Sequence, residues 1–550
     1  MKTTLLFFIT LLTFSKSGLS QTNNCEALNE ALEANTPIEK LNLSNCSIKA
    51  IPPQLKELPS CTQLILEGNS IKYAKFEGVE HLIAIDLSKN KLVSIHKDIQ
   101  NMSKLQVLKL SENQLTKIPE SIMGANQLTV LCVDGNRLNR IPDGLGKLSE
   151  LDSLSLHLNQ LPELSKWVDS LNNLSFLNAS FNQIATVSEG LWNLRSLEHL
   201  DLSDNQLTKE GLQLTRGTAP IKTLYLAGNQ LNEFPMEMAQ FSQLNYMDVS
   251  MNEITIWPGS MDGLNQLETL VLNSNQFTEI PTQIKDLNQL KCLKLENNKI
   301  ALVKEGLGEL KALNQLYLSD NNITALPDDI FLLENLVGLF VSGNGLKKLG
   351  EKWAGLKALE VLDLSRNEIT KLPETFTSLH ALKHFDCREN QLKTLPENIG
   401  YLTQLQELDL GENLIEQIPE GMFTLKELSS LKLDGNLIQK LPPGFMQLTQ
   451  LKNLELDGNL IKKLPKNIGD LKELRYLSLN GNQLKKLPES IGELSNLTYL
   501  SLEGNLLKKL PKSIGNLTNL KYLSISKNLI SFEEQKKIKA LLPKGCKIIL

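Results

Sequence analysis

The chain has 550 residues, of which 41% are apolar but only 5% aromatic, so its core must be built mainly from aliphatic side chains. Its formal net charge of −5 excludes a generally basic nucleic-acid-binding protein, and its apolar content excludes an acidic disordered chain. Seven cysteines in a chain of this length are too few for a scaffold held together by disulfides.

The first residues have the three-part pattern of a secretory signal peptide. Lys2 gives a positive start, residues 5–14 form a short apolar run, and the small residues Gly18 and Ser20 precede the expected cleavage point. That run is too short to span a bilayer, and no later segment reaches 18 uninterrupted apolar residues. We therefore predict a signal peptide at residues 1–20 and an exported chain without a transmembrane segment, either secreted or held in the cell envelope or periplasm.

From Ile38 onward the chain repeats a pattern of 23 residues. The segment from Leu405 reads LQELDLGENLIEQIPEGMFTLKE, and the next two copies begin at Leu428 and Leu451. All three share the frame L-x-x-L-x-L-x-x-N-x-L-x-x-L-P-x-x-I-x-x-L-x-x. Twenty-two such copies fill residues 38–530, which leaves almost no chain for another domain.

The spacing within a copy predicts its structure. The alternation L-x-L is typical of a short strand, and stacked copies would bury their leucines beneath a parallel sheet. The Asn at position nine is replaced in the first copy by Cys46, and elsewhere a buried amide there would form a ladder with neighbouring backbone groups. The proline predicts an extended segment that leads the chain back after the strand. The I-x-x-L spacing that follows it predicts a short helical turn. We expect an α/β solenoid with the parallel sheet on its concave face and the helical turns on its convex face.

These copies resemble leucine-rich repeats of the typical 23-residue class. Their LPxxI variant resembles that of Ras-scaffold-type and plant intracellular Ras-group-related proteins, and the exported form resembles secreted bacterial leucine-rich repeat proteins. The resemblance covers the chain from Ile38 to its C-terminus. It implies a solenoid used for protein–protein recognition, and it names no partner.

Both ends of the solenoid need a cap, because an end copy exposes its core. Residues 21–37 contain Leu28 and Leu32 at helical spacing, which predicts an N-terminal helical cap, and residues 531–550 predict a C-terminal cap with a charged helix.

Two cysteines lie where the expected N-terminal helix meets the first strand. Cys25 lies at the start of the expected helix and Cys46 at the end of the first strand, so we predict a Cys25–Cys46 disulfide in an oxidising compartment. Cys61 is the rival partner, and three free thiols are the remaining alternative.

Catalytic motifs are missing from the sequence. There is no phosphate-binding loop of the G-x-x-x-x-G-K-[ST] type, no C-x-x-C pair and no G-x-S-x-G nucleophile turn. His380 and His384 lack the glutamate of a zinc protease and would not share a helix face. We expect no enzyme activity, no cofactor and no metal site.

Aromatic side chains gather on neighbouring strands of copies seven to ten, at variable positions that face the concave side. Exposed aromatic groups flanked by carboxylates are typical binding anchors. The predicted ligand-binding residues are Phe176, Phe181, His199, Asp201, Tyr225, Tyr246, Asp248 and Met251. Tyr317 with Phe340 forms a second, smaller group.

Acidic side chains outnumber basic ones on the same face, which disfavours nucleic acid and anionic membranes as partners. Lysines collect instead in late copies as the pairs 462–463, 485–486 and 508–509, which are either a solvated edge or a contact for an anionic surface. The sequence thus predicts a non-catalytic exported binding module whose concave face recognises a protein. The alternatives are a structural or cell-envelope spacer and a binder of a cell-surface glycan.

Overall fold

The computed structural model describes residues 25–33 and 37–550. The predicted signal peptide, residues 1–20, lies outside the described residues, as do residues 21–24 and 34–36 of the chain that follows it. The chain divides into two compact units, Met1–Ile221 and Lys222–Leu550.

In the first unit, the described strands of the main sheet recur once per copy and pair in parallel with their neighbours along the chain. They are β1 (Lys40–Asn42), β2 (Gln63–Ile65), β4 (Ala84–Asp86), β6 (Val107–Lys109), β7 (Val130–Cys132), β8 (Ser153–Ser155), β10 (Phe176–Asn178) and β12 (His199–Asp201). Two short parallel pairs lie in the return segments: β3 (Tyr73–Ala74) with β5 (Ser94–Ile95), and β9 (Glu163–Leu164) with β11 (Thr186–Val187). The helices of this unit are α2 (Ala27–Glu33) and the 3₁₀ helices η1 (Pro53–Glu57), η2 (Lys97–Asn101), η3 (Glu120–Gly124), η4 (Asp143–Lys147), η5 (Val168–Ser170), η6 (Glu189–Asn193) and η7 (Glu210–Leu212).

The second unit repeats this plan. Its main-sheet strands are β13 (Thr223–Tyr225), β14 (Tyr246–Asp248), β15 (Thr269–Val271), β17 (Cys292–Lys294), β19 (Gln315–Tyr317), β20 (Gly338–Phe340), β21 (Val361–Asp363), β22 (His384–Asp386), β23 (Glu407–Asp409), β24 (Ser430–Lys432), β25 (Asn453–Glu455), β26 (Tyr476–Ser478), β27 (Tyr499–Ser501), β28 (Tyr522–Ser524) and β29 (Lys547–Ile549). A short side pair joins β16 (Glu279–Ile280) to β18 (Leu302–Val303). The helices are η8 (Met236–Gln240), η9 (Thr282–Asp286), η10 (Leu307–Glu309), η11 (Asp328–Leu332), η12 (Trp353–Gly355), η13 (Glu374–Ser378), η14 (Glu397–Tyr401), η15 (Glu420–Thr424), η16 (Pro443–Gln447), η17 (Ile468–Asp470), η18 (Glu489–Glu493), η19 (Lys512–Asn516) and α3 (Phe532–Leu541).

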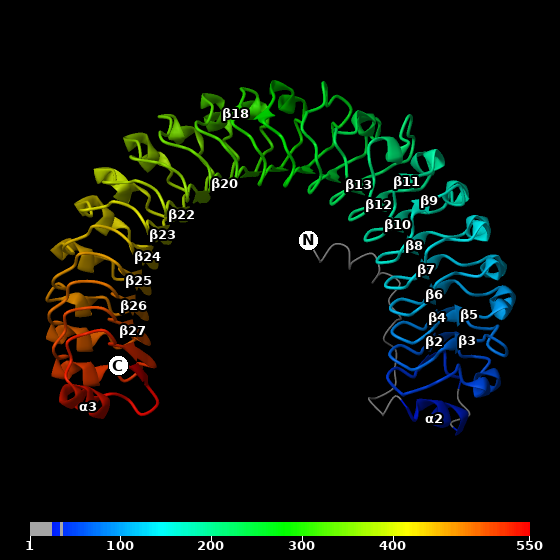
Figure 1. Ribbon diagram of the computed structural model, residues 1–550, viewed down its shortest axis with the longest axis horizontal. Helices are drawn as coiled ribbons and strands as arrows, with labels where there is room; N and C mark the ends of the chain where they lie inside the picture. Colours follow the sequence, from blue (N-terminus) through cyan, green and yellow to red (C-terminus); the bar gives the residue numbers. More distant parts are fainter. Residues whose placement is uncertain (1–24, 34–36) are drawn as a thin grey trace. The chain divides into compact units, whose positions relative to one another are not determined.

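Strand register follows the repeat without slippage. Leu431 lies opposite Leu454, and Leu454 opposite Leu477, so each leucine row continues through the stack. These side chains are buried, which gives each unit an aliphatic core. In each unit the strands line the inner side of the stack and the 3₁₀ helices its outer side (Figure 1). The predicted α/β solenoid with a parallel sheet is thereby confirmed.

The helical turns are 3₁₀ rather than α because each has room for little more than one turn. Many follow a proline, such as Pro419 before η15, whose fixed φ of −68° sets the entry of the chain. The buried Met422 and Phe423 of η15 cover the core from the outer side. The predicted helical turn of each repeat thus takes this tighter form.

The C-terminal segment adds both a helix and a strand. Ser531 caps α3 by accepting a hydrogen bond from the backbone N–H of Glu534, 3.3 Å away. The final apolar stretch forms β29, which pairs in parallel with β28 and extends the sheet by one strand. The sequence pattern predicts the helix, whereas the strand is a finding of the structure.

Candidate binding surface

Most main-sheet strands bury their middle side chain, and in many of them the flanking positions are only partly buried. In β13, Leu224 is buried in the core, whereas Thr223 and Tyr225 on either side of it are only partly buried. The outward positions vary from copy to copy, while the inward position stays apolar and is leucine in most copies. The strand face is therefore the part of each copy where side chains can change without disturbing the core.

An asparagine ladder fixes the turn that follows each strand. In copy eleven, the Nδ2 atom of Asn275 donates to the carbonyl oxygens of Val249, in the preceding copy, at 3.0 Å and of Leu272 at 3.1 Å. Its Oδ1 atom accepts from the backbone N–H of Ile254 at 3.0 Å. The predicted ladder is confirmed, and its bonds tie each copy to the one before.

The residue before each ladder position adopts a left-handed backbone conformation. In all 22 copies of the described solenoid its φ is positive, and eight copies place Gly there. Three copies instead carry an apolar side chain that is largely exposed: Leu158 at 53%, Phe181 at 49% and Met251 at 61%. A left-handed conformation costs an ordinary L-residue about 1–2 kcal/mol, so neither backbone geometry nor burial explains these three residues.

In the first unit, the predicted site residues lie on two adjacent strands and the turn beyond them. Phe176 of β10 lies opposite His199 of β12, but Phe176 is only 9% exposed and offers little surface. Phe181 makes an edge-on contact with the ring of His157, with centroids 5.2 Å apart. Leu158 sits in the preceding copy at the same turn position as Phe181. The sequence pattern missed Leu158 and His157, although an apolar residue just before the ladder Asn would have been the signal.

In the second unit, Tyr225 and Tyr246 form a pair on the strand face. Their ring centroids are 4.9 Å apart and their planes are tilted by 38°. Met251 lies in the turn after β14. Asp248 is nearly buried and accepts hydrogen bonds from the backbone N–H and the hydroxyl of Ser250, so it supports that turn rather than facing a ligand.

Burial raises the pKa of the carboxyl groups of Asp201 and Asp248 above the ordinary range for aspartate. Both accept from a backbone N–H two residues on, and Asp201 bonds in this way to Ser203. The predicted pairing of exposed aromatics with exposed carboxylates is therefore wrong for Asp248, because its carboxylate is used inside the fold.

The second predicted aromatic group is stacked. Tyr317 and Phe340 have centroids 4.5 Å apart and planes within 4° of parallel, and the Lys294 ammonium lies 4.9 Å from the Tyr317 ring. Tyr476, Tyr499 and Tyr522 form a longer stack at the C-terminal end, with centroid spacings of 4.2 and 4.5 Å. Face-to-face stacking leaves only ring edges and hydroxyls of these tyrosines for a partner.

Three aspartates follow the Tyr317–Phe340 pair in consecutive copies. Asp363 lies opposite Asp386, and Asp386 opposite Asp409, around a hollow of about 200 Å³. Burial, together with the charges of its two neighbours, raises the pKa of Asp386 to about 6. Lys432 forms an ion pair with Asp409 at 3.1 Å. This part of the strand face is acidic, as the composition of the variable positions predicts.

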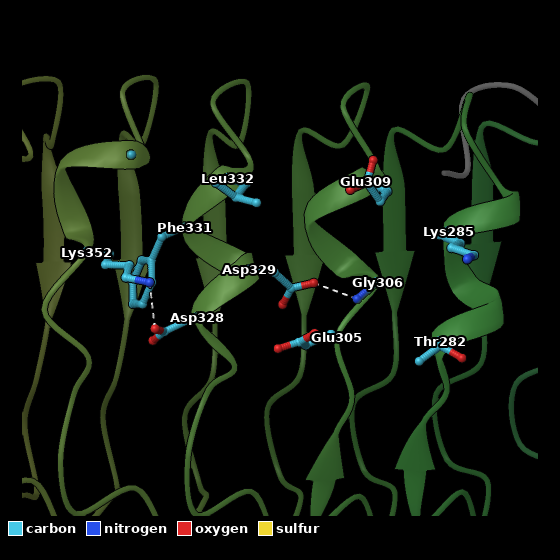
Figure 2. A pocket seen from close by; sticks show the side chains of 11 residues that line it. Thr282, Lys285, Glu305, Gly306, Glu309, Asp328, Asp329, Phe331, Leu332 and Lys352 are labelled. Carbon is cyan, nitrogen blue, oxygen red and sulfur yellow. Dashed lines mark hydrogen bonds and ion pairs between the residues drawn. The ribbon is translucent and has the colours of Figure 1, made fainter.

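A hollow of about 690 Å³ lies among η9, η10, η11 and η12 on the outer side of the second unit (Figure 2). Asp329 accepts from the backbone N–H groups of Gly306 at 2.5 Å and Gly308 at 3.1 Å. Lys352 pairs with Asp328 at 2.7 Å. These charged groups already bind one another or the backbone, so the hollow is explained by the capping of η10.

The described part of the chain groups no side chains as a metal site. Among residues 25–33 and 37–550, no three His, Cys, Asp or Glu side chains are grouped so that they could hold a metal ion. Burial raises the pKa of the Cys61 thiol to about 11 and that of the Cys132 thiol to about 12, so both stay protonated at neutral pH.

Sequence comparison decides the family. A family model described as a leucine-rich repeat region matches residues 38–255 and 460–542, and a second, described as leucine rich repeat, matches five segments between residues 266 and 484. The chain belongs to the leucine-rich repeat proteins. No significant match to a curated protein sequence is found.

Several leucine-rich repeat structures have a similar fold. The Arabidopsis receptor kinase HAESA, solved with the peptide hormone IDA and the co-receptor SERK1, is 28% identical over 90% of this chain and 87% of its own, with a TM-score of 0.62. A TDR receptor is 25% identical over 94% of both chains, with a TM-score of 0.63. The plant peptide hormone receptor RGFR1 is 23% identical over 89% of this chain and 78% of its own, with a TM-score of 0.56, which shows a shared fold alone.

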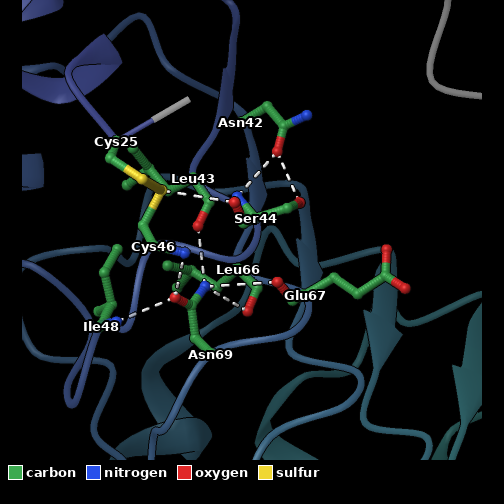
Figure 3. The surroundings of a disulfide bond; sticks show 9 residues. All are labelled: Cys25, Asn42, Leu43, Ser44, Cys46, Ile48, Leu66, Glu67 and Asn69. Atoms are coloured by element: carbon green, nitrogen blue, oxygen red, sulfur yellow. Dashed lines mark hydrogen bonds between the residues drawn. A yellow bond between two sulfur atoms is a disulfide. The ribbon is translucent and has the colours of Figure 1, made fainter. Parts of the chain in front are cut away.

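The first leucine-rich repeat is tied to the N-terminal helix. Cys25 and Cys46 form a disulfide, with Cα atoms 5.1 Å apart (Figure 3). Asn69 of the next copy accepts from the backbone N–H groups of Cys46 and Ile48, both at 2.9 Å. Cys61, the rival partner, is a buried free thiol. In the described part of the chain, no helix combines the length and the apolar character needed to cross a membrane.

Proposed function

We propose that this leucine-rich repeat protein is a non-catalytic, exported module that recognises another protein through its strand face and the adjoining turns. The observation that carries the proposal is the exposure of Leu158, Phe181 and Met251 at a backbone position where other copies use glycine. Each of these side chains costs the fold both backbone strain and exposed apolar surface. Such costs are typical of residues kept for an interaction.

The similar receptor structures support a protein or peptide as the partner. The HAESA structure contains a peptide hormone and a co-receptor protein, and its chain matches 90% of this one. The paired rings of Tyr225 and Tyr246 add the kind of rigid aromatic contact that dominates many protein interfaces. A spacer without a ligand would need no such groups on its strand face. A cell-surface glycan stays the second candidate, since tyrosines also suit sugar rings.

Export is supported by the sequence pattern at the N-terminus. Expression of the full chain in a secreting host, followed by N-terminal sequencing of the released protein, tests it directly. We expect the mature chain to begin at Gln21, after cleavage behind Ser20. Recovery of the protein inside the cell with Met1 retained would contradict export.

The binding surface is tested with the mature chain as bait for proteins and, in a parallel array, for glycans. Once a partner is purified, we expect the double variant Tyr225→Ala with Tyr246→Ala to weaken binding by about tenfold or more. The variant Leu158→Ala with Phe181→Ala tests the first unit in the same way.

The matched control is Tyr73→Ala with Tyr401→Ala. These two tyrosines are exposed, whereas Tyr225 and Tyr246 are partly buried, and they lie on β3 and η14, away from the main sheet. Unchanged affinity in both test variants would place the site elsewhere on the solenoid. Retention of glycans without any protein partner would favour the second candidate.

A further inference from the structure

The lysine pairs of the late copies occupy equivalent places along the second unit. The residue just before each pair accepts a hydrogen bond through its carbonyl oxygen from a backbone N–H of the next copy. The N–H of Gln483 donates to the carbonyl oxygen of Ile461, and the N–H of Leu506 donates to that of Leu484, both at 3.0 Å. Copies joined in this way lie about 4.8 Å apart. The second lysine of each pair therefore recurs in a row with that spacing.

A groove of about 1570 Å³ runs along this row and is also lined by α3. Its lysines are Lys463, Lys466, Lys486, Lys509, Lys512 and Lys537. The buried side chains of Leu464, Leu487 and Leu510 also line it and supply apolar surface beside the lysines. Lys462, Lys485 and Lys508 are not among the lining residues, so only one lysine of each pair belongs to the groove.

Six lysines and three glutamates line this groove, so its net charge is positive. Its three carboxylates are already engaged: Glu493 pairs with Lys472 at 3.2 Å, Glu534 pairs with Lys537 at 3.2 Å, and Glu489 accepts from the backbone N–H of Ser513 at 3.3 Å.

Within the described residues, the other five lysines that line the groove have no carboxylate within 4.0 Å. The row therefore concentrates positive charge along the groove, where it would attract an anionic ligand.

We propose that this groove binds a linear anionic polysaccharide, with one acidic sugar facing each lysine of the row. A pyranose ring spans a length similar to the strand spacing, whereas side chains on one face of an extended acidic peptide recur only every ~6.6 Å. The apolar floor suits the carbon–hydrogen faces of sugar rings. No Phe, Tyr or Trp lines the groove, so it lacks the stacking surfaces that single-stranded nucleic acid uses.

Heparin serves as the probe, with the mature full-length chain on the sensor or in the calorimeter. We expect binding at about 0.1 M salt that weakens steeply as salt is raised. The triple variant Lys463→Gln, Lys486→Gln, Lys509→Gln should bind at least about tenfold more weakly and show a shallower salt dependence. Its thermal unfolding should match that of the parent protein, because these side chains are exposed.

The control is a second triple variant, Lys348→Gln, Lys371→Gln, Lys393→Gln. These lysines occupy the same or the adjacent repeat position in earlier copies, are also exposed, and lie outside the groove. Equal weakening in the control, no heparin binding by the parent protein, or equal affinity for single-stranded DNA or for vesicles containing anionic lipid would overturn the proposal. The Tyr225→Ala, Tyr246→Ala variant should bind heparin normally, which separates this groove from the strand-face site.

Discussion

The backbone N–H of Ile254 donates to the Oδ1 atom of Asn275, 3.0 Å away in the next copy. Asn275 in turn donates to the carbonyl oxygen of Val249, which lies just after β14 in the same copy as Ile254. One amide therefore satisfies both sides of a turn that the backbone alone leaves unpaired. The stability of each copy thus depends on a side chain supplied by its neighbour.

Replacement of Asn275 by Ala should lower the free energy of unfolding by about 1–3 kcal/mol, because buried backbone groups lose their partners. Gln276→Ala is the control: Gln276 is only partly buried, and its side chain accepts a hydrogen bond from Lys299 rather than from a buried backbone group. Thermal and urea unfolding compare the two variants. In repeat proteins each copy is stabilised mainly by its contacts with the adjacent copies. Hydrogen exchange should therefore increase first in copies ten and eleven. Equal stability of both variants would argue against a stabilising role for the ladder.

Replacing Phe181 by glycine should destabilise the protein less than replacing it by alanine. Both variants lose the ring contact with His157, worth about 0.5–1.5 kcal/mol. Only glycine relieves the left-handed backbone, where φ is 54°, by about 1–2 kcal/mol. We therefore expect Phe181→Gly to unfold at a higher temperature than Phe181→Ala. The order should reverse at Phe176, which lies within β10, because glycine weakens strands. A lower melting temperature for Phe181→Gly than for Phe181→Ala would refute the strain argument.

The repeat frame predicts the parallel sheet, the leucine core, the ladder and the outer helical turns, because each follows from a fixed spacing. Other features depend on which copies become neighbours. The burial of Phe176 results from packing between β10 and its neighbours, and the lysine groove needs α3 to fold back beside η18 and η19. The sequence of a single copy therefore predicts neither the burial of Phe176 nor the lysine groove. The turn position of Phe181 and Met251 could have been recognised, since glycine recurs there in eight other copies.

The Cys25–Cys46 disulfide should be found by peptide mapping without reduction. It closes a sequence separation of 21 residues, so its loss should destabilise the N-terminal copies by about 3 kcal/mol. The variant Cys46→Ser should therefore increase hydrogen exchange in β1 and β2. Cys61→Ala is the control, because Cys61 is a free thiol whose removal leaves the map unchanged. Detection of Cys25 as a free thiol in the secreted protein would contradict the pairing.

Asp386 should make stability fall as pH rises. Its pKa in the folded protein is about 6, whereas the pKa of an aspartate in an unfolded chain is about 3.9. Between these values the folded chain holds a proton that the unfolded chain has lost, so the free energy of unfolding decreases from about pH 4 to about pH 6 and is then constant. The carboxylate is partly exposed, and solvent screening reduces the size of this change.

The variant Asp386→Asn should keep the fold and should remove the decrease in the free energy of unfolding that Asp386 causes as pH rises. The Oδ1 atom of Asp386 accepts from the backbone N–H of Arg388 at 3.0 Å, and Asn178 makes the equivalent bond to Ser180 at 2.9 Å in another copy. An amide therefore suffices for the turn, and the charge is not needed for folding. Melting temperatures at pH 4 and pH 7 should show the variant gaining stability relative to the parent protein as pH rises. The exposed Asp262→Asn serves as the control, and a parallel pH profile for the parent protein and Asp386→Asn would show that the aspartate row carries no electrostatic cost.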